Sequence, residues 1–328
     1  MRERQLGRTG SMVSEIGFGA WAIGASWGKV DDSEAVAALH AALDAGVTFI
    51  DTADVYGDGH SEKLIARVLK ERGEPRPFVA TKAGRRLPEQ VVEGYSYENL
   101  KGWTERSLRN LEVETLDLVQ LHCPPTDLYY HPEVFATLDR LVKEGNLRNY
   151  GVSVERVEEG LKAIEYPGVV SVQIIFNIFR RRPIESFFSA AKARDVAIIA
   201  RVPLASGLLS GKFSAQTTFE QTDHRQFNRH GESFDVGETF SGVPYEVGLA
   251  AVEKIRPLVG DDTTMAKFAL RWILMFNEVT VAIPGARNVA QARSNADAAA
   301  LASLSAQTMD HLAAIYEADI RPYVHQRW

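Results

Sequence analysis

Short apolar runs alternate with longer segments of helical periodicity from about residue 15 to about residue 300 of this 328-residue chain. Such runs predict buried strands, and apolar residues repeated every three or four positions predict helices that pack against a sheet. Eight runs, each followed by a helical segment, indicate an α/β protein with a (β/α)8 or TIM barrel in a single domain. The predicted strands cover residues 15–19, 48–51, 78–82, 116–122, 146–152, 170–175, 196–201 and 279–283. The predicted helices lie near 33–45, 61–72, 97–111, 132–144, 155–164, 184–194, 247–258 and 287–299.

Three parts of the chain lie outside this repeat. Residues 1–12 contain a turn signal from Leu6 to Gly10, which predicts a small hairpin that closes the N-terminal end of the barrel. Residues 205–245 are too many and too polar for a simple connection, and connections of this length are usually lids or binding loops. Residues 303–328 are expected to form one more helix and a tail. We therefore expect one barrel domain over 1–328 with these three additions.

Four polar residues follow predicted strands. Asp51, Lys82 and His122 each end an apolar run, and Tyr56 comes five residues after Asp51. Because the carboxyl ends of barrel strands open on one face, these side chains are expected to converge. An acid, a phenol, an amine and an imidazole together are suited to proton transfer.

Composition and charge exclude several classes of protein. The chain is 45% hydrophobic and 24% charged, with a net charge of -6, so nothing favours binding to a nucleic-acid backbone. No apolar stretch is long enough to predict a membrane span or a secretory leader. A single cysteine excludes an intrachain disulfide, and we expect a cytoplasmic protein. No pattern indicates an oligomeric state.

The lone cysteine, Cys123, directly follows His122. Adjacent strand residues point in opposite directions, so Cys123 is expected to point away from any site that His122 faces. We assign it no catalytic role, and we expect no metal site.

The motifs of this chain resemble those of the aldo-keto reductases over nearly its whole length. The resemblance depends on several motifs in the right order: Gly17-Phe18-Gly19 with Trp21; residues 49–57 with Gly59, Ser61 and Glu62; Ala80-Thr81-Lys82; residues 117–122; Gly151-Val152-Ser153; and Ile283-Pro284-Gly285.

The resemblance implies a role for each of the four polar residues in reducing an aldehyde or ketone. Tyr56 would be the general acid that protonates the carbonyl oxygen, and Lys82 the cation that stabilises its phenolate. Asp51 would pair with Lys82 and keep it charged. His122 would donate a hydrogen bond to the carbonyl oxygen. Substrate contacts are expected from Trp21, Trp27, Tyr56 and His122.

The resemblance also implies NADP(H) as the cofactor, although no Gly-x-Gly-x-x-Gly turn precedes a helix. Ser153 and Gln173 would lie near the nicotinamide carboxamide, and the small residues of 203–212 would admit the pyrophosphate. Arg287, just after Gly285 at a helix start, would bind a ribose 2′-phosphate. The implied cofactor residues are Gly19, Ala20, Trp21, Ser153, Gln173, Arg201, Pro203, Leu204, Ser206, Gly207, Leu209, Ser210, Lys212, Gly285, Arg287, Gln291 and Asn295.

Two residues depart from the family pattern. Arg201 stands where the family often has an aromatic residue on the nicotinamide, and it could stack there, bind a substrate carboxylate or bind a cofactor phosphate. Val154 stands where many members have Asn, which would remove one polar contact with the carboxamide.

Several alternatives stay open from the sequence. A lysine at a barrel strand could be the nucleophile of a Schiff-base aldolase. The same fold also serves as a cofactor-sensing regulatory subunit of ion channels, with little or no turnover. The aromatic residues Phe179, Phe227, Phe234 and Phe240 suggest an apolar substrate pocket, although they could equally belong to the core.

Overall fold

Eight parallel strands form the centre of the molecule in the computed structural model, which describes residues 1–24 and 30–328. Within those residues each strand pairs with the next along the chain, from β3 to β10. Isolated bridges between Ile16 and Ala282 and between Gly19 and Gly285 connect the first strand to the last. The predicted barrel is confirmed. Its strands are β3 (Phe18–Gly19), β4 (Phe49–Asp51), β5 (Phe78–Ala83), β6 (Leu118–His122), β7 (Tyr150–Ser153), β8 (Val169–Ile175), β9 (Ala197–Arg201) and β10 (Val279–Ala282).

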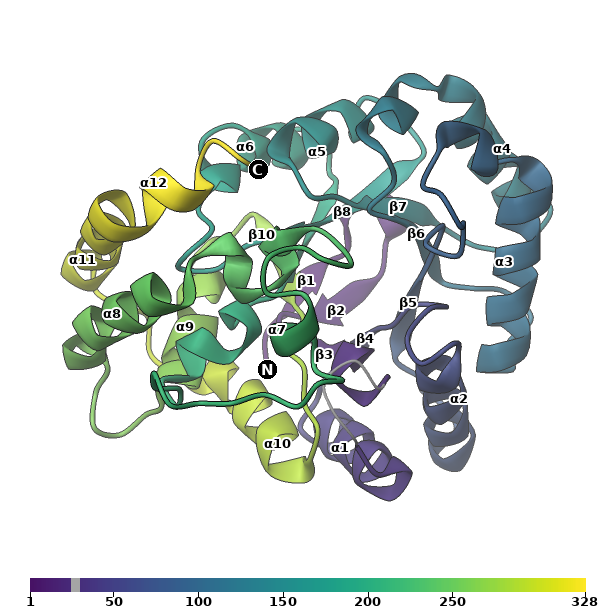
Figure 1. The fold of residues 1–328 in the computed structure, drawn as a ribbon. Coiled ribbons are helices and arrows are strands. Elements are labelled where there is room, and N and C mark those ends of the chain that lie inside the picture. The colour runs from purple at the N-terminus through teal and green to yellow at the C-terminus, as the bar shows by residue number, and fades with distance from the viewer. Residues whose placement is uncertain (25–29) are drawn as a thin grey trace.

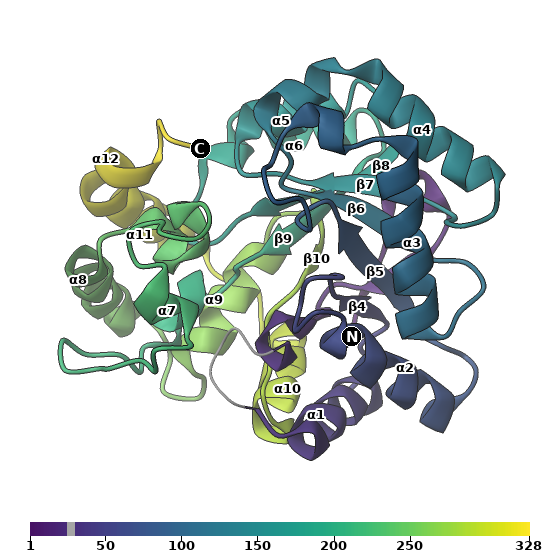
Figure 2. The same ribbon diagram turned by 45° about the vertical axis from the view of Figure 1, so that its right-hand side comes forward.

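Helices surround these strands, as Figures 1 and 2 show. One helix near the end of the barrel, α9, was not predicted from the sequence. The helices of the barrel are α1 (Asp32–Asp44), α2 (His60–Arg72), α3 (Tyr97–Leu111), α4 (Pro132–Lys143), α5 (Val157–Ala163), α6 (Phe187–Lys192), α8 (Tyr245–Ile255), α9 (Met265–Leu274) and α10 (Val289–Asp297). At the C-terminus, α11 (Ala306–Ile315) and α12 (Arg321–Val324) lie outside the barrel, where α11 contacts α8.

The alternation of side chains along the strands divides the barrel interior into layers. Phe49 and Asp51 share one face of β4, and Leu118 and His122 share one face of β6. Phe49 and Leu118 belong to a buried apolar cluster that also includes Leu6 from the N-terminal segment. The polar residues therefore lie one layer above an apolar floor.

An antiparallel pair, β1 (Glu3–Gln5) and β2 (Met12–Ser14), precedes the barrel. Arg4 of this pair forms a salt bridge with Glu15 at 2.9 Å and donates hydrogen bonds to three backbone carbonyls between Leu274 and Val279. A single arginine thus ties the N-terminal pair to the segment that leads into β10.

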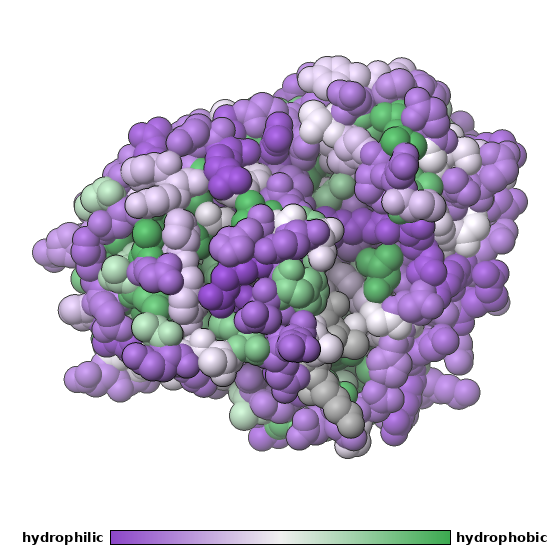
Figure 3. All heavy atoms as spheres, viewed as in Figure 1, coloured by the Kyte–Doolittle hydropathy of each residue, from purple (hydrophilic) through white to green (hydrophobic). Residues whose placement is uncertain are grey.

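The segment 205–245 crosses the mouth of the barrel and includes the short helix α7 (His224–Phe227). Within this segment, Ser206 donates to the carbonyl of Glu238. The C-terminal Trp328 donates to Asp235 at 2.8 Å and so ties the segment to the end of the chain. The face in Figure 3 is mostly hydrophilic, with hydrophobic residues in small separate patches. No helix among the described residues is long and apolar enough to cross a membrane.

Candidate active site

Lys82, at the end of β5, brings three of the four predicted residues into direct contact. Its Nζ donates to Asp51 Oδ2 at 2.7 Å, to the carbonyl of Thr52 at 2.8 Å and to the hydroxyl of Tyr56 at 3.2 Å. The fourth residue, His122, packs edge-on against the Tyr56 ring with centroids 5.9 Å apart. The strand ends therefore bring all four predicted side chains to one place.

The Lys82 ammonium is fully buried, so its charge depends on its partners. Burial alone would lower its pKa, but Asp51 and Tyr56 outweigh that effect and raise it. Asp51 is itself held by two amides, because Gln173 donates to its Oδ1 at 2.7 Å and Gln120 at 3.3 Å. Lys82 is therefore a permanently charged group at neutral pH.

Tyr56 keeps its proton in this environment. Burial raises the pKa of its phenol, and although the Lys82 ammonium opposes that effect, Asp51 and Glu238 add to it. Trp21 stacks on the Tyr56 ring at 6.2 Å. The loop fits closely because a Cβ at Gly24 would lie only 2.6 Å from the Tyr56 Cβ. The phenol is thus positioned as a proton donor.

His122 is a neutral imidazole. Burial, together with the cations Arg85, Lys82 and Arg201, lowers its pKa well below the usual value. A neutral imidazole carries one N–H and can donate a hydrogen bond without adding a charge.

A cavity of about 530 Å³ runs across the barrel mouth from these residues to the start of α10. Most of the predicted cofactor residues line it, whereas Ala20, Ser153 and Leu209 do not. Trp27, which was predicted to contact the substrate, lies outside the described residues. The lining residues expected from the sequence are Gly19, Trp21, Asp51, Tyr56, His122, Gln173, Arg201, Pro203, Leu204, Ser206, Gly207, Ser210, Lys212, Gly285, Arg287, Gln291 and Asn295.

The backbone after β9 has an unusual conformation where it borders this cavity. Val202, Ala205 and Ser206 have φ values of 52°, 47° and 52°, and Gly207 has a φ of 99°. Left-handed residues cost energy, above all a branched one such as Val202. The N–H groups of Ala205 and Gly207 donate to the carbonyls of Val202 and Leu204, which fixes this turn at the edge of the cavity.

Arg201, for which the sequence left three roles open, pairs with two glutamates. Its Nη2 donates to Glu155 Oε2 at 2.8 Å and to the carbonyl of Val154 at 3.0 Å, and its Nη1 lies 3.6 Å from Glu238 Oε1. Arg85 also contacts both glutamates, at 2.5 Å to Glu238 and 3.3 Å to Glu155. Arg201 is therefore part of a buried ion network at the cavity wall, and it is not an isolated cation.

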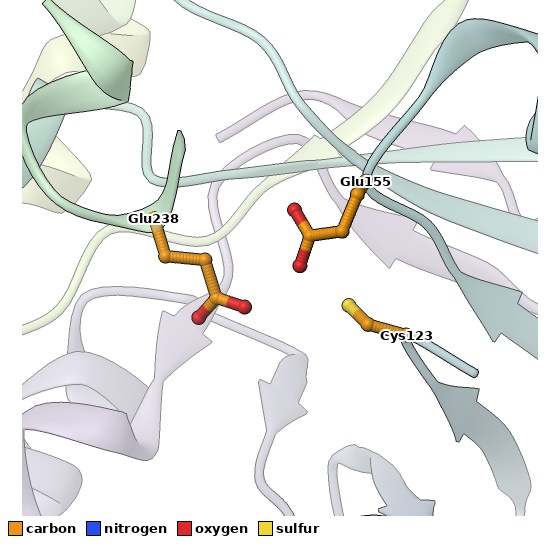
Figure 4. A group of neighbouring side chains, drawn as sticks. All are labelled: Cys123, Glu155 and Glu238. Atoms are coloured by element: carbon orange, nitrogen blue, oxygen red, sulfur yellow. The ribbon is translucent and has the colours of Figure 1, made fainter. Parts of the chain in front are cut away.

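Cys123 is not among the residues that line the cavity His122 faces, in agreement with the alternation along β6, but its thiol lies beside the ion network. Its φ of 47° turns the chain after the strand ends, and Sγ lies 3.5 Å from Ser153 Oγ. Figure 4 shows its thiol beside Glu155 and Glu238. The three could geometrically surround an ion. However, two arginines already pair with both carboxylates, and burial raises the pKa of the thiol to about 12, so the chemistry of the group does not suit a metal.

The four phenylalanines that the sequence suggested for an apolar substrate pocket do not line the cavity. Phe179 and Phe240 are buried, and Phe227 packs on Phe234, which in turn contacts Trp21. None of these four phenylalanines is among the described residues that line the cavity. Phe213 lines it instead.

Sequence reasoning missed two charged residues of the wall, Arg225 and Glu238, both in the segment 205–245. Its length and polarity marked it as a binding loop. No local pattern, however, distinguished these two side chains from its exposed charges.

Known proteins support the assignment. The model of the Aldo/keto reductase family matches residues 15–317. The chain belongs to the aldo/keto reductase family. Among curated relatives, this reductase is 30% identical to aldo-keto reductase YhdN of Bacillus subtilis over 89% of this chain and 86% of the relative. It is 26% identical to aldo-keto reductase yakc of Schizosaccharomyces pombe, which is named for NADP(+), over 86% and 83%.

Solved structures agree on the fold of this aldo/keto reductase. The glycerol dehydrogenase AKR11B4 of Gluconobacter oxydans is 31% identical, with a TM-score of 0.75 over 96% of this chain and 94% of that one. The holo form of AKR11C1 from Bacillus halodurans is 27% identical, with the same TM-score and 96% coverage of both chains. A probable potassium channel β subunit of Arabidopsis thaliana is 25% identical over 90% of both sequences.

The reductase carries one buried acid close to Tyr56 that the four-residue site does not use. Neither carboxyl oxygen of Asp54 has a hydrogen-bond partner among the described residues. Burial and the neighbouring Glu62 raise its pKa to about 7, against weaker opposition from Arg86 and Arg106. A proton on Asp54 therefore stabilises the fold fully below the unfolded pKa of 3.8, and that contribution is lost as the pH rises from there to about 7.

Asp54→Asn should raise the melting temperature at pH 8.5 by about 2 °C or more, because the amide removes a buried charge. At pH 5 the gain should be smaller, because the native carboxyl is protonated there and only the unfolded chain has an ionised Asp54. The matched control is Asp58→Asn, an exposed residue whose pKa is lowered by Arg86 and Arg106, and which should give no gain at pH 8.5. Equal changes for Asp54→Asn at both pH values would contradict this account of Asp54.

Proposed function

We propose that this protein reduces an aldehyde or ketone to the alcohol with NADPH, with Tyr56 as the general acid. The observation that carries the proposal is the contact of Lys82 Nζ with both Asp51 and the Tyr56 hydroxyl. A buried phenol beside a buried ammonium can give up a proton and leave a stabilised phenolate.

NADPH, when bound, supplies the hydride that adds to the carbonyl carbon. The carbonyl oxygen lies between Tyr56 and His122, and His122 donates a hydrogen bond to it as negative charge develops. Tyr56 transfers its proton to that oxygen, which completes the alcohol. Lys82 stabilises the phenolate that results, and Asp51 holds Lys82 in place.

The groove fits a dinucleotide phosphate. The backbone amides of Leu204 and Ser206 would hold the pyrophosphate, since Pro203 has no N–H and those of Ala205 and Gly207 donate to backbone carbonyls. Arg287, Gln291 and Asn295 line the far end of the cavity. Arg287 lies just before α10, where the helix dipole also favours an anion. Gln173 would meet the carboxamide, although one of its amide hydrogens is already bonded to Asp51.

Two other functions fit less well. A Schiff-base aldolase needs a deprotonated lysine, whereas the pKa of Lys82 is raised and its ammonium makes three hydrogen bonds. A cofactor-sensing subunit of the same fold would keep the groove but show tight NADPH binding without turnover. Steady oxidation of NADPH with a generic aldehyde distinguishes the reductase from the sensor.

Tyr56→Phe should lower kcat for carbonyl reduction by about 10² to 10⁴-fold and change NADPH affinity little, because it removes only the proton donor. NADPH consumption and NADPH fluorescence titration measure the two effects. Tyr129→Phe, which changes a buried tyrosine that does not line the cavity, is the control and should retain activity. A Tyr56→Phe variant with more than about a tenth of the native kcat would exclude Tyr56 as the acid.

Arg287→Ala should weaken NADPH binding by about 10 to 100-fold and NADH binding little, because a charge-assisted contact with the 2′-phosphate contributes roughly 1.5 to 3 kcal/mol. Arg293→Ala, an exposed arginine on the same helix, should affect neither cofactor. Titration of both cofactors with each variant measures this. Equal weakening of NADPH and NADH would show that Arg287 supports the loop and does not recognise the phosphate.

A further inference from the structure

The mouth of the barrel carries a buried ion network that the proposed reaction does not use. Arg85 follows β5, Glu155 follows β7, Arg201 ends β9, and Glu238 comes from the segment that crosses the mouth. Arg201 and Glu238 line the same cavity as Tyr56 and His122, and their side chains are only 8% and 5% exposed.

Arg201 has donors to spare. Its Nη2 is used by Glu155 and the Val154 carbonyl, but its Nη1 makes no hydrogen bond with the described residues and lies 3.6 Å from Glu238 Oε1. Its Nε is also buried without an acceptor among them. An arginine with unmet N–H groups at a cavity wall gains from an added acceptor.

Glu238 supplies an acceptor beside these donors. Burial would raise its pKa, but Arg85, Arg201 and a hydrogen bond with Glu155 outweigh burial and lower it, so Glu238 is a carboxylate at neutral pH. Burial raises the pKa of Glu155 to about 8, so of the two glutamates Glu238 holds the negative charge. The wall therefore offers an N–H donor and a carboxylate acceptor 3.6 Å apart.

Both groups line the cavity that Tyr56 and His122 also line. Trp21, which stacks on the Tyr56 ring and lines the same cavity, presents a flat ring on which the C–H face of a small substrate can lie.

We propose that Arg201 and Glu238 form a specificity subsite that selects carbonyl substrates with a hydroxyl group next to the carbonyl. This inference rests on the proposed reductase function. A hydroxyl is the substituent that accepts a hydrogen bond from Arg201 and donates one to Glu238 at the same time. An alkyl group in the same place would make neither of these hydrogen bonds.

A carboxylate fits this subsite less well, although it could reach Arg201. It has no proton to donate to Glu238, and it would lie beside a carboxylate in a poorly solvated wall. The subsite therefore favours a hydroxyketone or hydroxyaldehyde over both an alkyl ketone and a keto acid.

Three ketones that share the group CH₃–CO–CH₂– test the inference with the native protein: hydroxyacetone, butanone and acetoacetate. Hydroxyacetone and butanone differ by one hydroxyl against one methyl. With NADPH, each is reduced with uptake of one hydride at carbon and one proton at oxygen, and hydroxyacetone gives propane-1,2-diol. We expect kcat/KM for hydroxyacetone to exceed that for either other ketone by about tenfold or more.

Glu238→Gln tests which residue produces the preference. It keeps the size of the side chain but removes the charge, so hydroxyacetone should lose about tenfold more in kcat/KM than butanone, while acetoacetate gains relative to both. A merely structural role would lower all three ketones alike. Glu232→Gln, the same change at an exposed position of the same segment, should leave the ratios unchanged.

The results distinguish failure of the specificity subsite from failure of the reductase function. Equal kcat/KM for hydroxyacetone and butanone, or a preference for acetoacetate, with the native protein would overturn the subsite and leave the reductase function intact. Failure to oxidise NADPH with all three ketones and with simple aldehydes would overturn the reductase function and the subsite together. These native-protein results stand even if Glu238→Gln does not fold.

Discussion

A lysine ammonium enclosed at the barrel mouth is the constraint on which the rest of the site depends. In this buried site, Lys82 stays charged only because Asp51, a backbone carbonyl and the Tyr56 hydroxyl surround it. Removing one partner of such a pair commonly costs about 3 to 5 kcal/mol. The amides of Gln173 and Gln120 in turn fix Asp51, so several strands contribute to one charge.

The barrel makes this arrangement possible through strand register. Parallel strands bring alternate inward residues to the same height, so an apolar layer that includes Phe49 supports the layer of Asp51 and Lys82. The segment 205–245 then covers the polar layer and adds Glu238. Because Arg85 and Arg201 extend from the barrel to this glutamate, the cover and the strands form one electrostatic unit. The same unit lowers the pKa of His122, which helps to keep the imidazole neutral beside the substrate.

The sequence predicted the barrel because its strands are short buried runs, and it predicted the convergence of the four polar residues because barrel strands end on one face. The prediction from sequence failed where contacts between distant residues determine the structure. Helix α9 follows α8 between β9 and β10, so a pattern of one helix for each strand did not predict it. The partners of Arg201 come from residues 46 positions before and 37 positions after it, so no local pattern could reveal that its charge is shared.

The rate of hydride transfer in Lys82→Met, compared with that of the native protein, tests the central claim most directly. The chemical step is measured in a single turnover with NADPH deuterated at the transferred position, for the native protein and the variant, from pH 6 to pH 9. We predict that the native rate is high at pH 7, and that the variant rate there is lower by at least about a hundredfold with the deuterium isotope effect fully expressed. A variant that transfers deuterium at the native rate at pH 7 would contradict the claim that the buried ammonium makes Tyr56 an acid.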